Sequence, residues 1–177
     1  GTAGLNTLNA GAGTFSIGGN ASFGGAGDAL NAANYVTETN GTLIMNGTSG
    51  TLSANALDDS FYNLTFGGVG SLAINASSTV AVGGNLTING ALSSFAANSS
   101  TVTMTGVGQY INGGGKTLYN LAVNPSTPGT ITVQTTTVKV GGTLSIADGD
   151  TLSIDSAMSA YVNFGGSLSI GTGSTIT

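Results

Sequence analysis

The sequence contains no cysteine, histidine, arginine or tryptophan, and it has only two lysines among 177 residues. Without cysteine there is no disulfide, thiol nucleophile or iron–sulfur ligand, and without histidine there is no imidazole to act as a catalytic base. Seven acidic residues against two lysines leave a net charge of −5, so no basic surface can neutralise a run of phosphates. These absences predict a protein that is not an enzyme and binds no nucleic acid.

Long apolar runs are also absent, since no stretch approaches the roughly 18 consecutive apolar residues of a membrane-spanning helix. The chain does not open with a methionine followed by a basic and then an apolar segment. We therefore expect that any signal peptide has been removed or that the chain is part of a longer protein. Hydrophobic residues make up 40% of the chain and charged residues 5%, which is not the composition of a disordered protein. We expect a single domain over residues 1–177, without membrane insertion.

What the sequence does contain is a repeated pattern built around a pair of glycines. An alternating apolar segment, Gly-Gly and a second alternating segment occur four times, as TFSIGGNASF at 14–23, TVAVGGNLTI at 79–88, TVKVGGTLSI at 137–146 and YVNFGGSLSI at 161–170. Between these copies, TLIMNG at 42–47 is matched by TVTMTG at 101–106, and FYNLTF at 61–66 by LYNLAV at 118–123. The order of the motifs indicates internal repeats over roughly 1–58, 59–116 and 117–177.

The spacing of the motifs predicts a solenoid. The first Thr or Tyr of each motif stands at position 14, 42, 62, 79, 101, 119, 137 or 161, which is a mean step of 21 residues. A turn of a parallel β-helix takes roughly 20 residues, and stacked turns bury faces that no single turn could bury. We therefore predict an all-β fold, a parallel β-helix (β-solenoid) of about eight rungs.

The alternation within each motif predicts which residues face the core. The inward residues are expected to be Phe15, Ile17, Phe23, Val80, Val82, Leu86, Ile88, Val138, Val140, Leu144, Ile146, Val162, Phe164, Leu168 and Ile170. Gly-Gly would form the corner between strands, because glycine adopts positive φ without steric cost. The four motifs should then stack in register, with Val80, Val138 and Val162 in one column or in parallel columns. Gly-Gly pairs also join antiparallel strands in hairpins, so the alternative fold is an antiparallel β-sandwich that assembles by strand exchange.

The repeat resembles a known class of protein. S-T-V-T-M-T-G at 100–106, L-Y-N-L-A-V-N at 118–124 and V-G-G-T-L-S-I at 140–146 are similar to the repeats of large secreted bacterial cell-surface proteins of the adhesin type. The resemblance covers about residues 42–170. Those proteins are generally taken to be β-solenoids, so the resemblance implies this architecture and a secreted, extracellular or cell-surface location. The repeat is of low complexity, so it implies no single activity.

Three acidic residues in the C-terminal part are candidate metal ligands. Asp148 and Asp150 lie two residues apart and Asp155 follows five residues later, and three carboxylates could hold calcium together with carbonyl oxygens. The alternative is that Asp148-Gly149-Asp150 forms a tight turn in which aspartate bonds its own backbone. Calcium is the one cofactor that the sequence suggests.

Seven Asn-x-Ser/Thr sequons make asparagine a candidate for N-glycosylation. They lie at Asn20, Asn40, Asn46, Asn63, Asn75, Asn85 and Asn98, all in the first hundred residues. Added mass is expected at outward positions such as Asn85. The alternative is that asparagine, serine and threonine furnish turns and uncharged solvent faces.

The two ends of the chain predict self-assembly. A solenoid exposes an unpaired strand edge at each end, and natural solenoids cap or blunt these edges. Residues 1–12 and 171–177 are uncharged, and the second segment keeps a strand-like alternation. We expect a homopolymer joined through its terminal edges, the structural subunit or repeat segment of an extracellular β-rich filament. The alternative is a non-polymerising adhesin stalk or carbohydrate-binding surface module, with glycan or cell-surface contacts.

Overall fold

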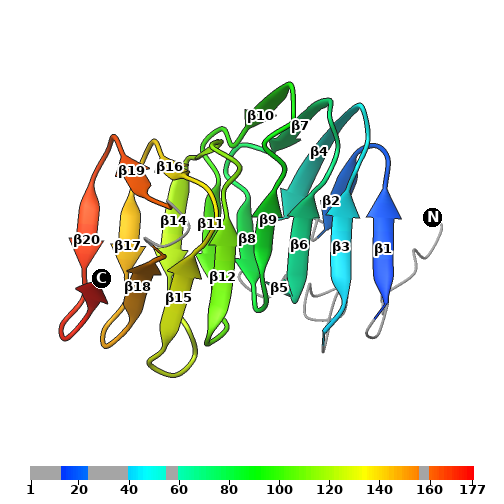
Figure 1. Cartoon of the computed structure of the whole chain (residues 1–177). Helices are drawn as coiled ribbons and strands as arrows, with labels where there is room; N and C mark the ends of the chain where they lie inside the picture. The colour runs from blue at the N-terminus through cyan, green and yellow to red at the C-terminus, as the bar shows by residue number, and fades with distance from the viewer. Residues whose placement is uncertain (1–12, 24–39, 55–59, 156–159) are drawn as a thin grey trace.

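The computed structural model describes residues 13–23, 40–54, 60–155 and 160–177. Within these residues every regular element is a strand, and every pair of neighbouring strands is parallel. Successive strands belong to different sheets, and from β3 onward each side of the molecule collects every third strand (Figure 1). The chain therefore winds as a parallel β-solenoid, which confirms the predicted fold and excludes the antiparallel sandwich.

Three sides enclose the interior. The eight-stranded sheet comprises β1 (Thr14–Ile17), β3 (Thr42–Met45), β6 (Asn63–Phe66), β9 (Leu86–Ile88), β12 (Gln109–Asn112), β15 (Thr130–Val133), β18 (Thr151–Ile154) and β21 (Thr175–Ile176). The six-stranded sheet comprises β5 (Ser60–Phe61), β8 (Thr79–Val82), β11 (Thr101–Met104), β14 (Asn120–Val123), β17 (Leu144–Ile146) and β20 (Leu168–Ile170). The described chain thus makes about six turns, close to the eight rungs predicted, and its longest side has eight strands.

The third side is divided into two sheets. The four-stranded sheet comprises β2 (Ala21–Phe23), β4 (Ser49–Ala54), β7 (Ser71–Ile74) and β10 (Ser94–Ala96), and the three-stranded sheet comprises β13 (Thr117–Leu118), β16 (Val138–Val140) and β19 (Val162–Phe164). In the described structure β10 and β13 do not pair with each other. The Nζ of Lys116, in the loop before β13, donates a hydrogen bond of 2.7 Å to the carbonyl of Leu92 and ties the two turns together at this break.

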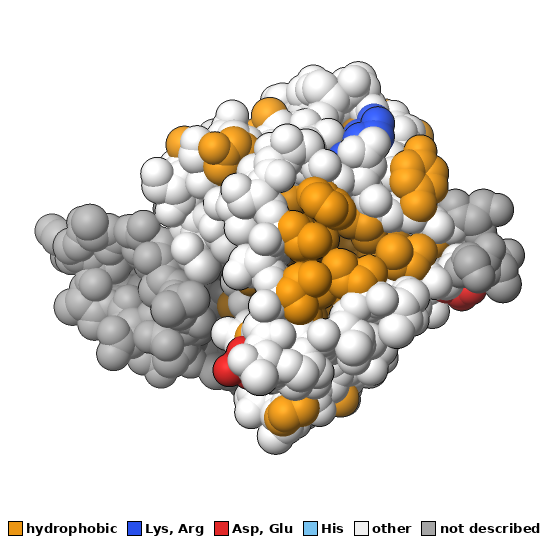
Figure 2. Space-filling view, turned by 90° about the vertical axis from the view of Figure 1, so that its left-hand side faces the viewer, with side chains coloured by type: hydrophobic (Ala, Val, Ile, Leu, Met, Phe, Trp, Pro, Cys, Tyr) orange, Lys and Arg blue, Asp and Glu red, His pale blue; other side chains and the backbone are white. Residues whose placement is uncertain are grey.

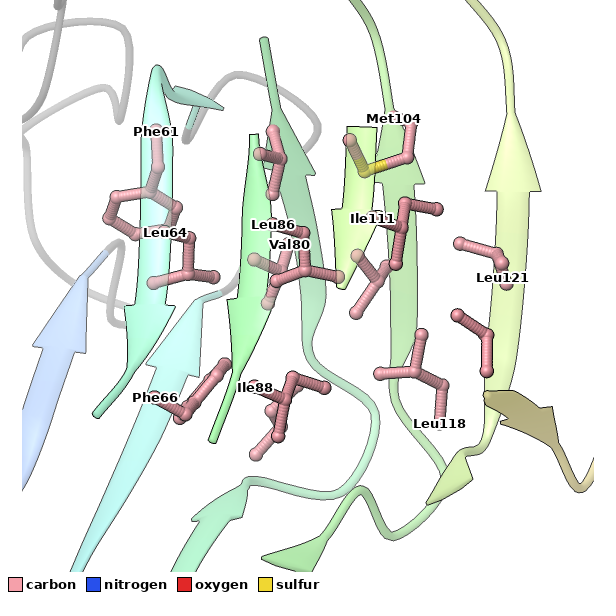
Figure 3. Packing of buried hydrophobic residues seen from close by; sticks show 14 of the residues in the cluster. Phe61, Leu64, Phe66, Val80, Leu86, Ile88, Met104, Ile111, Leu118 and Leu121 are labelled. Atoms are coloured by element: carbon pink, nitrogen blue, oxygen red, sulfur yellow. The ribbon is translucent and has the colours of Figure 1, made fainter. Parts of the chain in front are cut away.

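The inward residues of the strands form one continuous hydrophobic cluster along the axis. Figure 3 shows Phe61, Leu64 and Phe66 lying beside the inward residues of the following turns. Fully burying an aliphatic or aromatic side chain contributes roughly 1.5–3 kcal/mol, so the column is the main source of stability. The predicted inward residues of the internal turns are buried, namely Val80, Val82, Leu86, Ile88, Val138, Val140, Leu144 and Ile146. The side chain of Phe23 lies outside the described residues.

The repeat of the sequence and the turn of the fold differ in length. The 58 residues from Thr79 to Thr137 carry the chain from β8 to β16, which is eight strands, whereas one turn takes three. The second and third Gly-Gly motifs therefore lie two and two-thirds turns apart and on different sides, with Val80 in the six-stranded sheet and Val138 in the three-stranded sheet. The prediction that all four Gly-Gly motifs stack in register is wrong. Only the last two do so, with Val138 paired to Val162.

The Gly-Gly pairs lie at corners, as predicted, but for a different reason. None of the glycines in the four pairs has positive φ. A Cβ on Gly84 would lie 2.5 Å from the carbonyl oxygen of Tyr62 in the preceding turn, and a Cβ on Gly142 would lie 3.0 Å from that of Tyr119. The amide of each glycine donates to the same carbonyl, at 2.5 and 2.7 Å. At Gly84 and Gly142, glycine is needed because the neighbouring corner approaches too closely for a side chain, whereas a Cβ on Gly83 would meet no atom closer than 3.7 Å.

Candidate functional site: the uncovered end of the solenoid

The last turn ends in an uncovered apolar surface. In β20, Leu168 and Ile170 are 41% and 48% exposed, whereas Leu144 and Ile146, their partners in β17, are 1% and 2% exposed. All four side chains have the inward phase of their strands, so the difference arises because no further turn of the described chain lies on β20. The same holds for inward residues of β19 and β21, namely Phe164 and Ile176.

Figure 2 looks onto this end of the molecule. Hydrophobic side chains gather in one patch near the centre of the view, and no charged side chain lies within the patch. Contiguous exposed apolar patches mark interaction surfaces. We call this surface the C-terminal end face and define it by the inward residues Val162, Phe164, Leu168, Ile170 and Ile176.

The strands of the C-terminal end face also present backbone edges. Within the described residues, β19 pairs only with β16, β20 only with β17 and β21 only with β18. At the other end, β1 pairs with β3 alone among the described strands, and its inward Phe15 is exposed. Residues 1–12, which entered the prediction of self-assembly, lie outside the described residues. Edge N–H and C=O groups are a template for another strand.

Corner asparagines join each turn to the next and the previous one. The Oδ1 of Asn63 accepts a hydrogen bond of 2.8 Å from the amide of Asn85 in the following turn. Its Nδ2 donates at 3.3 Å to the Oγ1 of Thr42 in the preceding turn. One amide side chain thus links three successive turns, which adds a polar tie outside the apolar column.

The same arrangement recurs at the next copy of the motif. The Oδ1 of Asn120 accepts from the amide of Thr143 at 2.8 Å, and its Nδ2 donates to the Oγ1 of Thr101 at 3.2 Å. These bonds explain why the Tyr-Asn-Leu motif recurs in fixed order with the Thr motif before it and the Gly-Gly motif after it. The sequence reasoning missed this role, although the shared spacing of the three motifs was its visible signal.

The sequon asparagines differ in how their side chains are engaged. Asn63 and Asn98 use Nδ2, the atom that an N-linked glycan would occupy, for internal hydrogen bonds, that of Asn98 to Ile74 at 2.7 Å. Other sequon asparagines accept backbone N–H groups through Oδ1, namely Asn20 from Thr51, Asn75 from Ala76 and Asn85 from Tyr110. Asn40 and Asn46 are exposed, and their side chains make no hydrogen bond to any residue that the structure describes.

If the chain is N-glycosylated, we expect glycan at Asn40 and Asn46 and none at Asn63. Protein from a glycosylating host should then exceed 17.1 kDa in intact-mass measurement. Asn46→Gln should remove the mass of one glycan, whereas Asn63→Gln should leave the added mass unchanged. An intact mass equal to that of the sequence would show that these sequons are not used. Loss of glycan mass in Asn63→Gln would contradict the assignment from side-chain engagement.

The aspartates suggested for calcium have structural partners. The Oδ1 of Asp148 accepts from the amide of Thr172 at 2.8 Å, and the Oδ1 of the buried Asp150 accepts from the amide of Gly129 at 3.0 Å. Gly149 between them has φ of 76°, the geometry of the tight turn. No group of three acidic side chains that could hold a metal forms among the described residues, which include Asp155. The first two aspartates join this turn of the solenoid to its two neighbours.

A shallow hollow lies on the outer face of the eight-stranded sheet. It has a volume of about 170 Å³ and crosses β3, β6, β9 and β12. Its lining is polar and uncharged, apart from one half-exposed aromatic ring, and comprises Thr42, Asn63, Thr65, Asn85, Thr87 and Tyr110. A smaller apolar hollow of about 130 Å³ lies at the break between β10 and β13, lined by Phe95, Ala97, Asn98, Thr117, Leu118 and Tyr119.

Comparison of the chain with protein-family models, with curated proteins and with solved structures found no match. The assignment as a parallel solenoid rests on the geometry of the chain itself. None of the three comparisons supports the resemblance to adhesin-type repeats. In the part of the chain that the structure describes, no helix is long and apolar enough to cross a membrane.

Proposed function

We propose that this chain is a structural segment of an extracellular or cell-surface β-rich filament, and that copies assemble end to end. The observation that carries the proposal is that each turn of the described chain covers the inward side chains of the turn before it, and side chains of the same kind form the C-terminal end face. Within the chain, the side chains at the equivalent positions of β14 and β17 are covered by a following turn, whose strand pairs with theirs in parallel. A second copy supplies the same kind of surface.

The edges of the stack fit this arrangement. If β1 of a second copy pairs in parallel with β21, the eight-stranded sheet continues across the junction and the inward side chains of β1 cover those of β21. Such a contact is heterologous, because it joins two different surfaces of the same chain, and it therefore propagates instead of closing into a dimer. The extracellular setting rests on the resemblance to adhesin-type repeats. The absence of histidine and cysteine supports a structural role over a catalytic one.

Negative-stain electron microscopy of the full chain at neutral pH tests the proposal. We expect long unbranched filaments whose width is that of one solenoid. Because the contact is apolar and uncharged, filaments should persist or lengthen when the salt concentration is raised. Particles that remain single at every protein concentration would instead support the non-polymerising stalk. Dissolution of filaments by salt alone would show that charges elsewhere on the surface hold them together.

A further inference from the structure

The hollow lies on the outer side of the stack, over the second to fifth strands of the eight-stranded sheet, and not on an end face, so filament formation would leave it open. Its lining residues form two columns. On adjacent strands Thr42 pairs with Asn63, and the pairing of Leu64 with Leu86 places Asn63 beside Asn85. The next strand places Tyr110 beside Asn85, so Thr42, Asn63, Asn85 and Tyr110 form one outward column. Thr65 and Thr87 form the second column, two residues further along the strands. Rungs of a sheet repeat about every 4.8 Å, so the lining is a regular array of amide and hydroxyl groups.

Part of this array is already used within the solenoid. Asn63 engages both atoms of its amide, and the Oδ1 of Asn85 accepts from the amide of Tyr110 at 3.0 Å. The Nδ2 of Asn85, the hydroxyl groups of Thr65 and Thr87, and the phenol of Tyr110 make no hydrogen bond to any described residue. These groups face the hollow as donors and acceptors in fixed positions, because the bonds of Asn63 and Asn85 hold the corner.

The chemistry of the lining selects a class of ligand. No charged side chain lines the hollow, so neither phosphate nor carboxylate groups have a partner there. Hydroxyl and amide groups in mixed donor and acceptor positions match the hydroxyl groups of a sugar. The half-exposed ring of Tyr110 offers an apolar surface on which the C–H face of a sugar ring can lie. The hollow is much smaller than the pockets of roughly 300–1,000 Å³ that hold drug-sized ligands, which limits the direct contact to about one sugar unit.

From this geometry we propose that the outer face of the eight-stranded sheet binds a neutral carbohydrate in the hollow, with one sugar ring on Tyr110 and its hydroxyl groups bonded to Asn85, Thr65 and Thr87. The site is shallow and lies open along the strands, so it accommodates an internal unit of a polysaccharide as well as a chain end. Binding here does not depend on the filament proposal.

Saturation-transfer difference NMR on the full chain tests the site, because it detects the ligand's protons whether or not the protein is assembled. The probes are neutral hexasaccharides of glucose, mannose and N-acetylglucosamine, with a hexagalacturonate as the charged comparison. We expect transfer to at least one neutral probe and none to the hexagalacturonate. Tyr110→Ala should weaken binding about tenfold, the size expected for the loss of one aromatic contact. Thr87→Val, which keeps the shape and removes the hydroxyl, should weaken it by a smaller factor.

Tyr119→Ala is the matched control, since Tyr119 is exposed to a similar degree but lines the other hollow. Binding unchanged in Tyr119→Ala and weakened about tenfold in Tyr110→Ala supports the proposal. Absence of transfer to all the neutral probes would overturn it. An affinity that is unchanged in Tyr110→Ala, or lowered as much in Tyr119→Ala, would overturn it too, because the sugar would then lie elsewhere.

Discussion

Replacing Leu168 and Ile170 together by lysine should abolish filaments and leave the monomer folded. Both side chains are already 41% and 48% exposed in the single chain, so the lysines would lie in solvent there and cost little. In the proposed junction the same positions are covered by a second copy, and two ammonium groups would be buried without partners. An unpaired buried charge costs several kcal/mol, which exceeds what a single rung-to-rung contact can offset. Electron microscopy and sedimentation of the double variant measure the effect.

Ser169→Lys is the matched control for this experiment. Ser169 lies between the two residues on β20, has the opposite phase and is exposed. Its lysine would point outward from the junction and add the same kind of charge to the same strand, so filaments should persist. Circular dichroism should show the same β content in all variants. Filaments of normal length from the double variant would mean that the copies do not join through the C-terminal end face.

An aspartate in the central column should destabilise the chain more than any change on its surface. Leu121 in β14 is fully buried between Val102 in β11 and Leu144 in β17, and the hydrophobic cluster around it contains no basic residue. Leu121→Asp should lower the free energy of unfolding by about 4 kcal/mol or more, a large share of the 5–15 kcal/mol typical of a folded domain. Thermal denaturation should show Tm lower by about 10 °C or more.

Ala122→Asp places the same side chain one residue further along β14, on the opposite phase of the strand. Ala122 is partly exposed, so its aspartate can reach water. This variant should shift Tm by only a few degrees. Equal losses of stability in the two variants would contradict the assignment of inward and outward phases.

The fold was predictable because two signals in the sequence agree. Alternation places apolar residues on one side of each strand, and the step of about 21 residues matches one turn of a parallel solenoid. The burial of Val80, Val82, Leu144 and Ile146 follows from these two signals alone. Within the motifs the pattern favours strands over helices, since the apolar period there is two.

The stacking of the motifs could not be read from the sequence in the same way. Equal sequences suggest equal places, but a repeat of eight strands in a fold of three sides advances by two and two-thirds turns. The sequence shows the repeat length and not the number of strands within it. Gly84 shows a second limit of this kind. Its role depends on the distance to Tyr62 in another turn, a contact that becomes visible only when the turns are stacked.

The functional surfaces divide similarly. Free strand edges at the ends of a solenoid could be predicted from its topology. That Ile170 is exposed while its counterpart Ile146 is buried could be seen only in the structure. The hollow beside Tyr110 lies outside the sequence prediction because its residues come from four strands between 42 and 112. The paired hydrogen bonds of Asn63 likewise join residues more than twenty positions apart.

Fibre diffraction from aligned assemblies of the full chain tests the central claim most directly. If copies stack end to end as continued solenoids, the strands of every copy lie across the filament and their spacing runs along it. We predict a strong meridional reflection at about 4.8 Å, the distance between neighbouring strands. The same reflection on the equator would place the solenoid axis across the filament and would contradict assembly through the C-terminal end face.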